Sequence, residues 1–183
     1  MKISRKWEMP NSKTFKINAF RDLILKYTKS GMTIIDPFAN EHSIKDYLSH
    51  CNYISNDLDP QYNCDYSMEA GEYLATIKDC SVDMVLYDPP YTPRQVKECY
   101  TSLERTVTIT DTQQSYWANF KQHIARILKP GGICISFGWH SNGIGIVNNM
   151  DIIEILLVAH GGNKNDTIAT VDKKAYHQER MNI

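Results

Sequence analysis

The sequence predicts a three-layer α/β fold built on a mostly parallel sheet. Short apolar runs typical of strands alternate with segments whose apolar residues recur at helical spacing. Three of these runs end at or next to an aspartate, namely Asp36, Asp57 and Asp88. Parallel strands end at one edge of a sheet, where open α/β sheets bind their ligands. The three acids are therefore expected to lie along one ligand-binding rim.

The predicted elements follow from the apolar spacing and from the turn residues between them. Strands are expected over residues 32–35, 52–55, 82–87, 133–137, 151–160 and 167–171. Helices are expected over residues 18–29, 43–50, 68–78 and 114–128, the last ended by Lys129-Pro130-Gly131-Gly132. Gly161-Gly162-Asn163 joins the last two strands, which favours an antiparallel edge. Segment 92–113 shows no clear period and is predicted to be a loop or lid.

Length and composition exclude several classes of protein. A chain of 183 residues with 42% hydrophobic and 22% charged residues suits one soluble domain. It has no run of 18 apolar residues, and residues 1–10 are charged, so neither a membrane span nor a secretory signal is predicted and a cytoplasmic location is expected. The five cysteines form no C-x-x-C pair, which argues against a disulfide framework or a metal site.

Charge is distributed unevenly along the chain, although the net charge is only −1. Residues 1–30 carry +6, residues 36–91 carry −9 and residues 92–129 carry +3. An acidic middle between basic segments suits a cationic cofactor in one place and a phosphate backbone in another. Charge alone is equally compatible with solvated faces on which charges cluster by chance.

The most specific motif is Asp88-Pro89-Pro90-Tyr91, directly after an apolar strand. Two prolines fix φ and remove two backbone donors, so the strand stops and the corner is stiff. An exocyclic amine carries two N–H donors, which the Asp88 carboxylate and the Pro89 carbonyl are suited to accept. Tyr91 is suited to stack on an extruded base, a contact worth about 1–3 kcal/mol. The competing interpretation is a proline-rich turn with a chance aromatic residue.

This motif, together with Ile34-Ile35-Asp36-Pro37-Phe38-Ala39, resembles the amino-group DNA methyltransferases, which make N6-methyladenine or N4-methylcytosine. The resemblance covers about residues 14–169. It implies the Rossmann-like class I S-adenosylmethionine fold, with a seven-stranded sheet, and it implies S-adenosylmethionine as the cofactor. N4-cytosine enzymes more often begin the motif with Ser, so Asp88 favours adenine.

The same resemblance implies a set of cofactor-binding residues. Asp36 and Phe38 would line the methionine part, and Asp57 would bind the ribose. The separation between Asp36 and Asp57 agrees with the usual offset of about 20 residues between the first strand end and a ribose-binding acid. Asp65 would lie near the adenine amino group. Residues 1–17 would complete the pocket. The full predicted set is Thr14, Phe15, Asp36, Pro37, Phe38, Ala39, Asn40, Asp57, Leu58, Asp65, Tyr66 and Asp88.

The chain departs from the family pattern in two respects. Relatives carry glycines after Asp-Pro-Phe, whereas this chain continues Ala39-Asn40-Glu41-His42-Ser43. Either Asn40 adopts left-handed geometry in place of a glycine, or the cofactor pocket is altered. The chain also leaves no room for a separate target-recognition domain. Target recognition then falls to segment 92–115, to the basic N-terminal segment or to a partner protein.

Substrate contacts are predicted on the catalytic corner and around it. The substrate residues are Tyr91, Arg94, Lys97, Arg105, Trp139 and His140, of which the cations suit phosphate contacts. We expect S-adenosylmethionine-dependent methylation of adenine N6 in DNA by Asp88, Pro89, Pro90 and Tyr91. The alternatives are another base amine, either cytosine N4 in DNA or an RNA base, a catalytically silent protein that keeps the fold, and protein-glutamine methylation.

Overall fold

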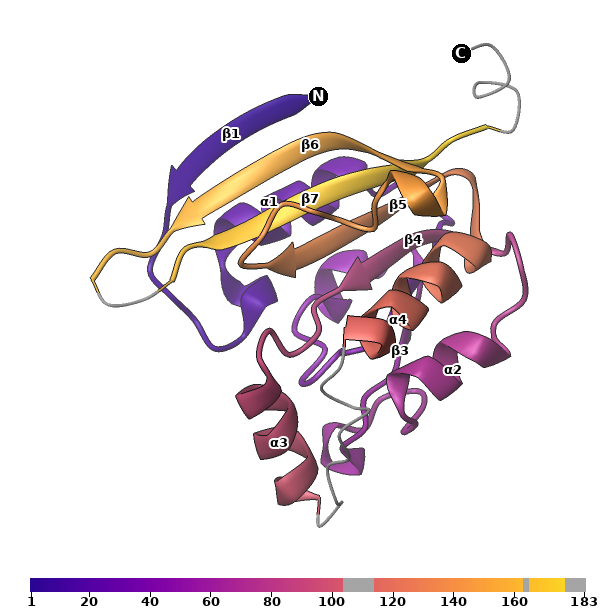
Figure 1. The fold of residues 1–183 in the computed structure, drawn as a ribbon, viewed down its shortest axis with the longest axis horizontal. Helices are drawn as coiled ribbons and strands as arrows, with labels where there is room; N and C mark the ends of the chain where they lie inside the picture. Colours follow the sequence, from indigo (N-terminus) through magenta and orange to yellow (C-terminus); the bar gives the residue numbers. More distant parts are fainter. Residues whose placement is uncertain (104–113, 163–164, 177–183) are drawn as a thin grey trace.

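The computed structural model describes residues 1–103, 114–162 and 165–176 and contains a single sheet flanked by helices (Figure 1). The strands are β1 (Lys2–Trp7), β2 (Thr33–Asp36), β3 (Asn52–Ser55), β4 (Val82–Tyr87), β5 (Leu128–Gly138), β6 (Met150–Ala159) and β7 (Thr167–Lys174). The α-helices are α1 (Asn18–Tyr27), α2 (Ala70–Thr76), α3 (Pro93–Ser102) and α4 (Gln114–Ile127). Short 3₁₀ turns cover Thr14–Lys16, Lys45–Leu48, Pro60–Tyr62 and Ile146–Asn148.

The sheet has seven strands in the order β1-β6-β7-β5-β4-β2-β3. Only β7 runs antiparallel to its neighbours, β5 and β6, while the other pairs are parallel. The expected mostly parallel, seven-stranded sheet is therefore confirmed. The predicted antiparallel pair of the last two strands is present, but the edge beyond it is formed by β1, which pairs parallel to β6.

The edge strand β1 was not predicted, because its sequence is charged rather than apolar. Its two lysines form ion pairs with acids of neighbouring elements. Lys2 Nζ lies 3.5 Å from Glu154 of β6, and Lys6 Nζ lies 3.6 Å from Asp22 of α1. The backbone ladder to β6, rather than an apolar face, therefore places this strand.

Successive side chains along a strand point to opposite faces of the sheet, and a layer of helices covers each face. Met84 and Leu86 of β4 pack in one core cluster with Phe20 and Ile24 of α1. On the other side of the sheet a second cluster joins strand residues to α2 and α4, and it contains Ile35, Tyr73, Leu74, Val85, Tyr87, Phe120, Ile124 and Ile127. Figure 1 shows α1 on one side of the sheet and α2 and α4 on the other. The three-layer prediction is thus confirmed.

Three local predictions differ from the structure. Residues 43–50 contain only the 3₁₀ turn Lys45–Leu48 instead of a helix, since Ile44 and Leu48 alone are buried there. Segment 92–113 was predicted to be a loop, but it begins with α3, and its residues 104–113 lie outside the described part of the chain. The predicted turn at residues 129–132 belongs to β5, where the pairing with β4 shifts register.

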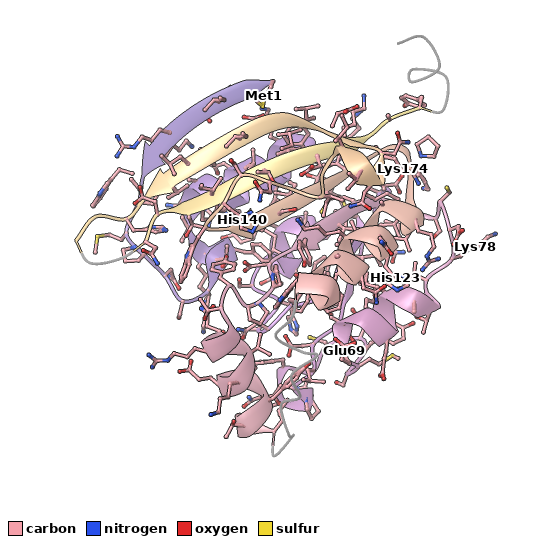
Figure 2. The ribbon with its side chains drawn as sticks, in the orientation of Figure 1. Met1, Glu69, Lys78, His123, His140 and Lys174 are labelled. Carbon is pink, nitrogen blue, oxygen red and sulfur yellow. The ribbon has the colours of Figure 1, made fainter. Side chains whose placement is uncertain are left out.

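The carboxyl ends of β2, β4 and β5 meet at one rim of the sheet, and α3 lies just beyond the end of β4 (Figure 1). Figure 2 shows Glu69 and His140 toward this rim, with Lys78 and Lys174 at the opposite end. Within the described residues, no helix is both long enough and apolar enough to cross a bilayer.

Candidate active site at the carboxyl rim

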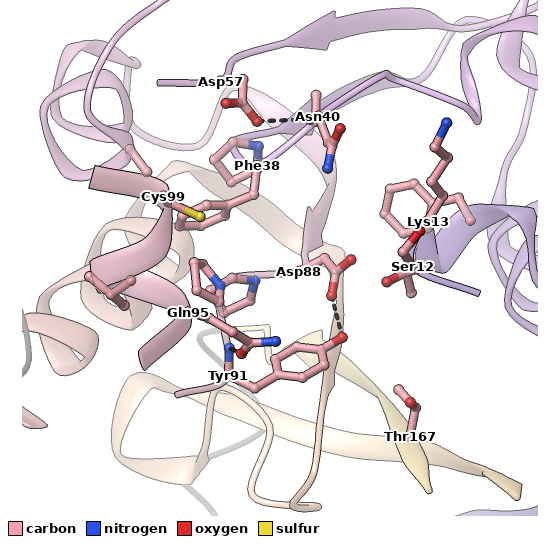
Figure 3. Close-up of a pocket in the computed structure, with 18 of the residues that line it drawn as sticks. Ser12, Lys13, Phe38, Asn40, Asp57, Asp88, Tyr91, Gln95, Cys99 and Thr167 are labelled. Carbon is pink, nitrogen blue, oxygen red and sulfur yellow. Dashed lines mark hydrogen bonds between the residues drawn. The ribbon is translucent and has the colours of Figure 1, made fainter. Parts of the chain in front are cut away.

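A cavity of about 640 Å³ opens at this rim, and much of the predicted site lines it (Figure 3). The walls come from the N-terminal segment, the loop after β2, the turn after β3, the corner after β4 and the start of α3. The predicted residues among the lining are Thr14, Phe15, Pro37, Phe38, Ala39, Asn40, Asp57, Leu58, Asp88, Pro89, Pro90, Tyr91 and Trp139. Strand-end residues far apart in sequence are thus brought together.

Several predicted residues lie elsewhere. Asp65 does not line the cavity; its Oδ2 accepts hydrogen bonds from Ser55 N and Ser55 Oγ, both at 2.8 Å. Tyr66 is exposed and packs against Tyr73, with ring centroids 5.2 Å apart. Both side chains stabilise the segment between β3 and α2 through these contacts. The spacing of residues in the sequence did not predict this orientation.

Two of the predicted cationic substrate residues also lie away from the cavity lining. Arg94 and Lys97 are on the exposed surface of α3, and Arg94 Nε lies 2.8 Å from Glu98 Oε1. Arg105 lies outside the described residues. His140 lines a second, neighbouring cavity.

Asp88 follows β4 directly, and its carboxylate is held by two hydroxyl groups. Tyr91 Oη donates a hydrogen bond to Asp88 Oδ1 at 2.5 Å, and the Thr14 side chain also hydrogen-bonds to the carboxylate. Burial raises the pKa of Asp88, while these two hydrogen bonds favour its ionised form and lower the pKa in part. A carboxylate offers about four lone-pair sites, so two remain for a ligand.

The start of α3 fixes the corner that carries Asp88. Gln95 Oε1 accepts hydrogen bonds from Tyr91 N at 2.7 Å and from Thr92 N at 3.0 Å, while Thr92 Oγ1 accepts one from Gln95 N at 3.2 Å. This is a capping box, in which side chains satisfy the free N–H groups of a first helical turn. The Thr92-x-x-Gln95 spacing indicates such a cap, and it is the feature of the sequence that would have identified both α3 and Gln95.

Tyr91 is anchored at both ends of its side chain. Its hydroxyl is bound to Asp88, and its ring meets Trp139 edge to face, with centroids 5.7 Å apart and planes at 63°. The orientation of the ring at the cavity wall is therefore fixed by one residue directly after β4 and one directly after β5, and Figure 3 shows the bond between Tyr91 and Asp88.

The glycine-free loop after β2 uses left-handed residues in place of glycines. Asn40 has φ +48° and His42 has φ +38°. The interpretation in which Asn40 takes the conformation of a missing glycine is thus confirmed. In that conformation Asn40 N donates to Asp57 Oδ2 at 2.8 Å, which joins the loop to the end of β3 (Figure 3).

We expect substitutions at Asn40 to follow this backbone geometry. Asn40→Val should lower the free energy of unfolding by about 1–2 kcal/mol, because a β-branched residue is strained at positive φ. Asn40→Gly should change it by less than about 1 kcal/mol. Urea titration of the two variants checks this. A valine variant as stable as the wild type would contradict the left-handed conformation.

Asp36, which was predicted to line the cofactor pocket, is fully buried and does not line the cavity, although Pro37 directly after it does. Its carboxylate accepts hydrogen bonds from Tyr53 Oη at 2.7 Å and from Phe38 N at 3.4 Å. Burial, with smaller contributions from the negative charges of Asp88 and Asp57, raises the pKa of Asp36 to about 7. Burial also raises the pKa of Asp57. The rim is consequently an acidic, partly desolvated environment that favours a cation.

The N-terminal segment closes one side of the cavity through contacts that the sequence did not reveal. Lys13 forms an ion pair with Glu41, and both residues line the cavity with Ser12 (Figure 3). Further lining residues that were not predicted include Glu69, Gln95, Val96, Cys99, Trp117, Phe120, His160, Asn165 and Thr167. Some of them adjoin predicted residues: Lys13 precedes Thr14, Glu41 follows Asn40, and residues 95–96 lie between Arg94 and Lys97. Sequence proximity therefore offered a clue at these positions.

Comparison with known proteins identifies the fold. Neither a protein-family model nor a curated protein sequence matches the chain. A methyltransferase from Archaeoglobus fulgidus that depends on S-adenosylmethionine superposes with a TM-score of 0.65 at 9% identity, covering 90% of this chain and 95% of that one. TrmN from Thermus thermophilus gives 0.60 at 18% identity over 85% of this chain, which spans 48% of the length of TrmN.

A third similar structure is a Burkholderia thailandensis N1-methyltransferase with bound 1,6-didemethyltoxoflavin and S-adenosylhomocysteine. It gives a TM-score of 0.58 at 10% identity, covering 86% of this chain and 76% of that one. The chain therefore has the fold of the class I S-adenosylmethionine-dependent methyltransferases.

Proposed function

We propose that the protein is an S-adenosylmethionine-dependent methyltransferase that acts on adenine N6 in DNA. The observation that carries this proposal is the Asp88-Pro89-Pro90-Tyr91 corner, which stands at the wall of the rim cavity with its carboxylate held but not saturated. Because the fold is shared with a protein named for N1-methylation of a small heterocycle, the choice of a nucleobase amine rests on this corner.

The large cavity fits the proposed cofactor in size and in charge. Its volume of about 640 Å³ falls within the usual range of about 300–1,000 Å³ for ligand pockets. Asp57 would accept the ribose hydroxyls, and Phe38 would contact the methionine part next to the buried Asp36. A sulfonium there would favour the ionised form of this carboxyl group, whose pKa burial has raised. When bound, the cofactor supplies an electrophilic methyl group.

The protein's own groups make the amine a better nucleophile. The lone pair of an aromatic amine is delocalised into its ring. Asp88 and the Pro89 carbonyl would accept the two N–H bonds, which favours a tetrahedral nitrogen and offsets the positive charge that develops there. An N–C bond to the methyl group would form as the S–C bond breaks, which leaves S-adenosylhomocysteine, and the Asp88 carboxylate would be placed to accept the proton that the nitrogen loses. In a duplex the base must first leave the stack.

Other functions remain alternatives, each with a discriminating result. An enzyme that methylates a base amine in RNA, or N4 of cytosine, needs the same two hydrogen-bond acceptors. A catalytically silent binding protein needs neither of them. Target recognition would fall to α3, to the basic N-terminal segment or to a partner protein. Incubation with S-adenosylmethionine and DNA or RNA, followed by nucleoside mass spectrometry, should yield N6-methyladenine from DNA. Another methylated nucleoside alone would move the proposal to that base.

Cofactor affinity should depend on Asp57 and not on Asp65. We expect Asp57→Ala to weaken S-adenosylmethionine binding by tenfold or more, because loss of charged hydrogen bonds costs about 1.5–3 kcal/mol. Asp65→Ala is the matched control, since this nearby carboxylate does not line the cavity. Isothermal titration calorimetry measures both. Absence of binding to the wild type at millimolar cofactor would remove the enzyme hypothesis.

A further inference from the structure

A second cavity of about 450 Å³ adjoins the first across the Asp-Pro-Pro-Tyr corner. Both cavities are lined by the same group of residues at the corner and beside it, namely Pro89, Pro90, Tyr91, Trp117 and Trp139. These side chains form a partition. A group bound at the corner from the second cavity would therefore face a ligand bound in the first.

The walls of the second cavity suit a flat heteroaromatic ring. Tyr87, Tyr91, Trp117 and Trp139 supply aromatic surface, and Lys121, Ser136, His140 and Asn142 supply a few polar groups. Ligand sites commonly have this make-up of mostly apolar walls with a small number of placed polar groups. Stacking on such side chains accepts any base, so the polar groups are what would distinguish one base from another.

Lys121 of α4 is the cationic side chain of this cavity, and its position is well defined. Its Nζ donates a hydrogen bond to the Gly143 carbonyl at 2.6 Å. Among the described residues this is its only hydrogen-bond acceptor within reach, so two of the three N–H donors of the ammonium are left for a ligand. Burial lowers the pKa of Lys121, and the negative charge of Asp172 acts in the opposite direction.

The loop that holds Lys121 is itself fixed by Asp172 of β7. This buried carboxylate accepts hydrogen bonds from Ile144 N at 3.1 Å and from Thr170 Oγ1 at 3.3 Å. Gly143 has φ +54°, and a Cβ there would lie 2.4 Å from Asp172 Oδ2. The position of the Gly143 carbonyl oxygen is therefore fixed. The hydrogen bond to this oxygen then orients the Lys121 ammonium group in the ligand-free protein.

We propose that the second cavity receives the ring of the target base and that Lys121 is a specificity residue, donating a hydrogen bond to one acceptor nitrogen of that ring. This inference rests on the proposed function and adds the recognition of the acceptor. The amine would lie at the partition, between the Asp88 carboxylate and the Pro89 carbonyl, while the ring lies against Tyr91 and Trp139 with Lys121 on its edge.

The test measures binding of adenosine by tryptophan fluorescence, with saturating S-adenosylhomocysteine to fill the first cavity. We expect Lys121→Met to weaken adenosine binding by tenfold or more, and Lys121→Arg to restore part of it. Lys129→Met is the matched control, because Lys129 pairs with Asp83, and neither of these two residues lines the first or the second cavity. Thermal unfolding of each variant confirms that the protein is folded.

Deaza analogues identify the acceptor and separate recognition from folding. The wild type should lose about tenfold affinity for one of 1-, 3- or 7-deazaadenosine, and Lys121→Met should show no further loss with that analogue. Equal affinity of wild type and Lys121→Met for adenosine would overturn the proposal, as would a wild type that binds no adenosine at millimolar concentration. Titration with S-adenosylhomocysteine alone tests the cofactor assignment separately, and there Lys121→Met should match the wild type.

Discussion

Asp88→Ala is expected to lower kcat for methyl transfer by about 10²–10³-fold or more, while the affinity for S-adenosylmethionine changes only a few-fold. Loss of one preorganised group that stabilises developing charge has an effect of this size in other enzymes. Asp88 adjoins the cavity, but the contacts proposed for the cofactor come mainly from other loops. Single-turnover rates with tritiated cofactor, together with calorimetry, measure the two effects.

Two further variants make this result specific. Asp83→Ala removes an acid at the amino end of the same strand, where Asp83 pairs with Lys129, and should leave kcat unchanged. Tyr91→Phe keeps the ring but removes the 2.5 Å hydrogen bond to Asp88, so we expect a loss smaller than that of Asp88→Ala. A wild-type rate in Asp88→Ala would refute the role assigned to the carboxylate.

The sequence predicts most accurately the strands that have apolar side chains at their centres. The strands over residues 52–55 and 82–87 have the predicted bounds, because each has apolar or aromatic residues at its centre and is followed directly by a polar residue, Asn56 or Asp88. Two elements escaped prediction for physical reasons. The strand β1 is held by backbone pairing and ion pairs, and α3 begins with a capping box while exposing most of its surface. Neither mechanism produces hydrophobic periodicity.

The same distinction applies to the candidate site. Asp57 and Asp88 lie at the rim because strand topology places every parallel carboxyl end there. The direction of a side chain in a turn is set by local partners, as Ser55 shows for Asp65. Lys121 comes from a helix and lines the same cavity as the motif only through tertiary packing, so no spacing in the sequence connects the two.

The buried acid Asp36 should make the stability of the protein depend on pH. Its pKa of about 7 lies far above the ordinary value of 3.8, so the folded state binds more protons than the unfolded state between about pH 4 and 7. The free energy of unfolding therefore falls as the pH rises through this window. Each pKa unit corresponds to about 1.4 kcal/mol, which gives about 4 kcal/mol for this group.

Asp36→Asn should remove this part of the pH dependence, because an amide stays neutral while its oxygen still accepts a hydrogen bond from Tyr53. Urea titrations at pH 5 and pH 8 should show that the variant gains stability relative to the wild type as the pH rises.

Tyr53→Phe is the converse control: the Tyr53 hydrogen bond lowers the pKa of Asp36, so its loss should move the window to higher pH. Asp57 and Asp88, whose pKa values are also raised, leave a smaller slope of the same sign in Asp36→Asn. Parallel pH profiles for the wild type and Asp36→Asn would contradict the raised pKa of Asp36, because they would show that folding does not change its protonation in this window.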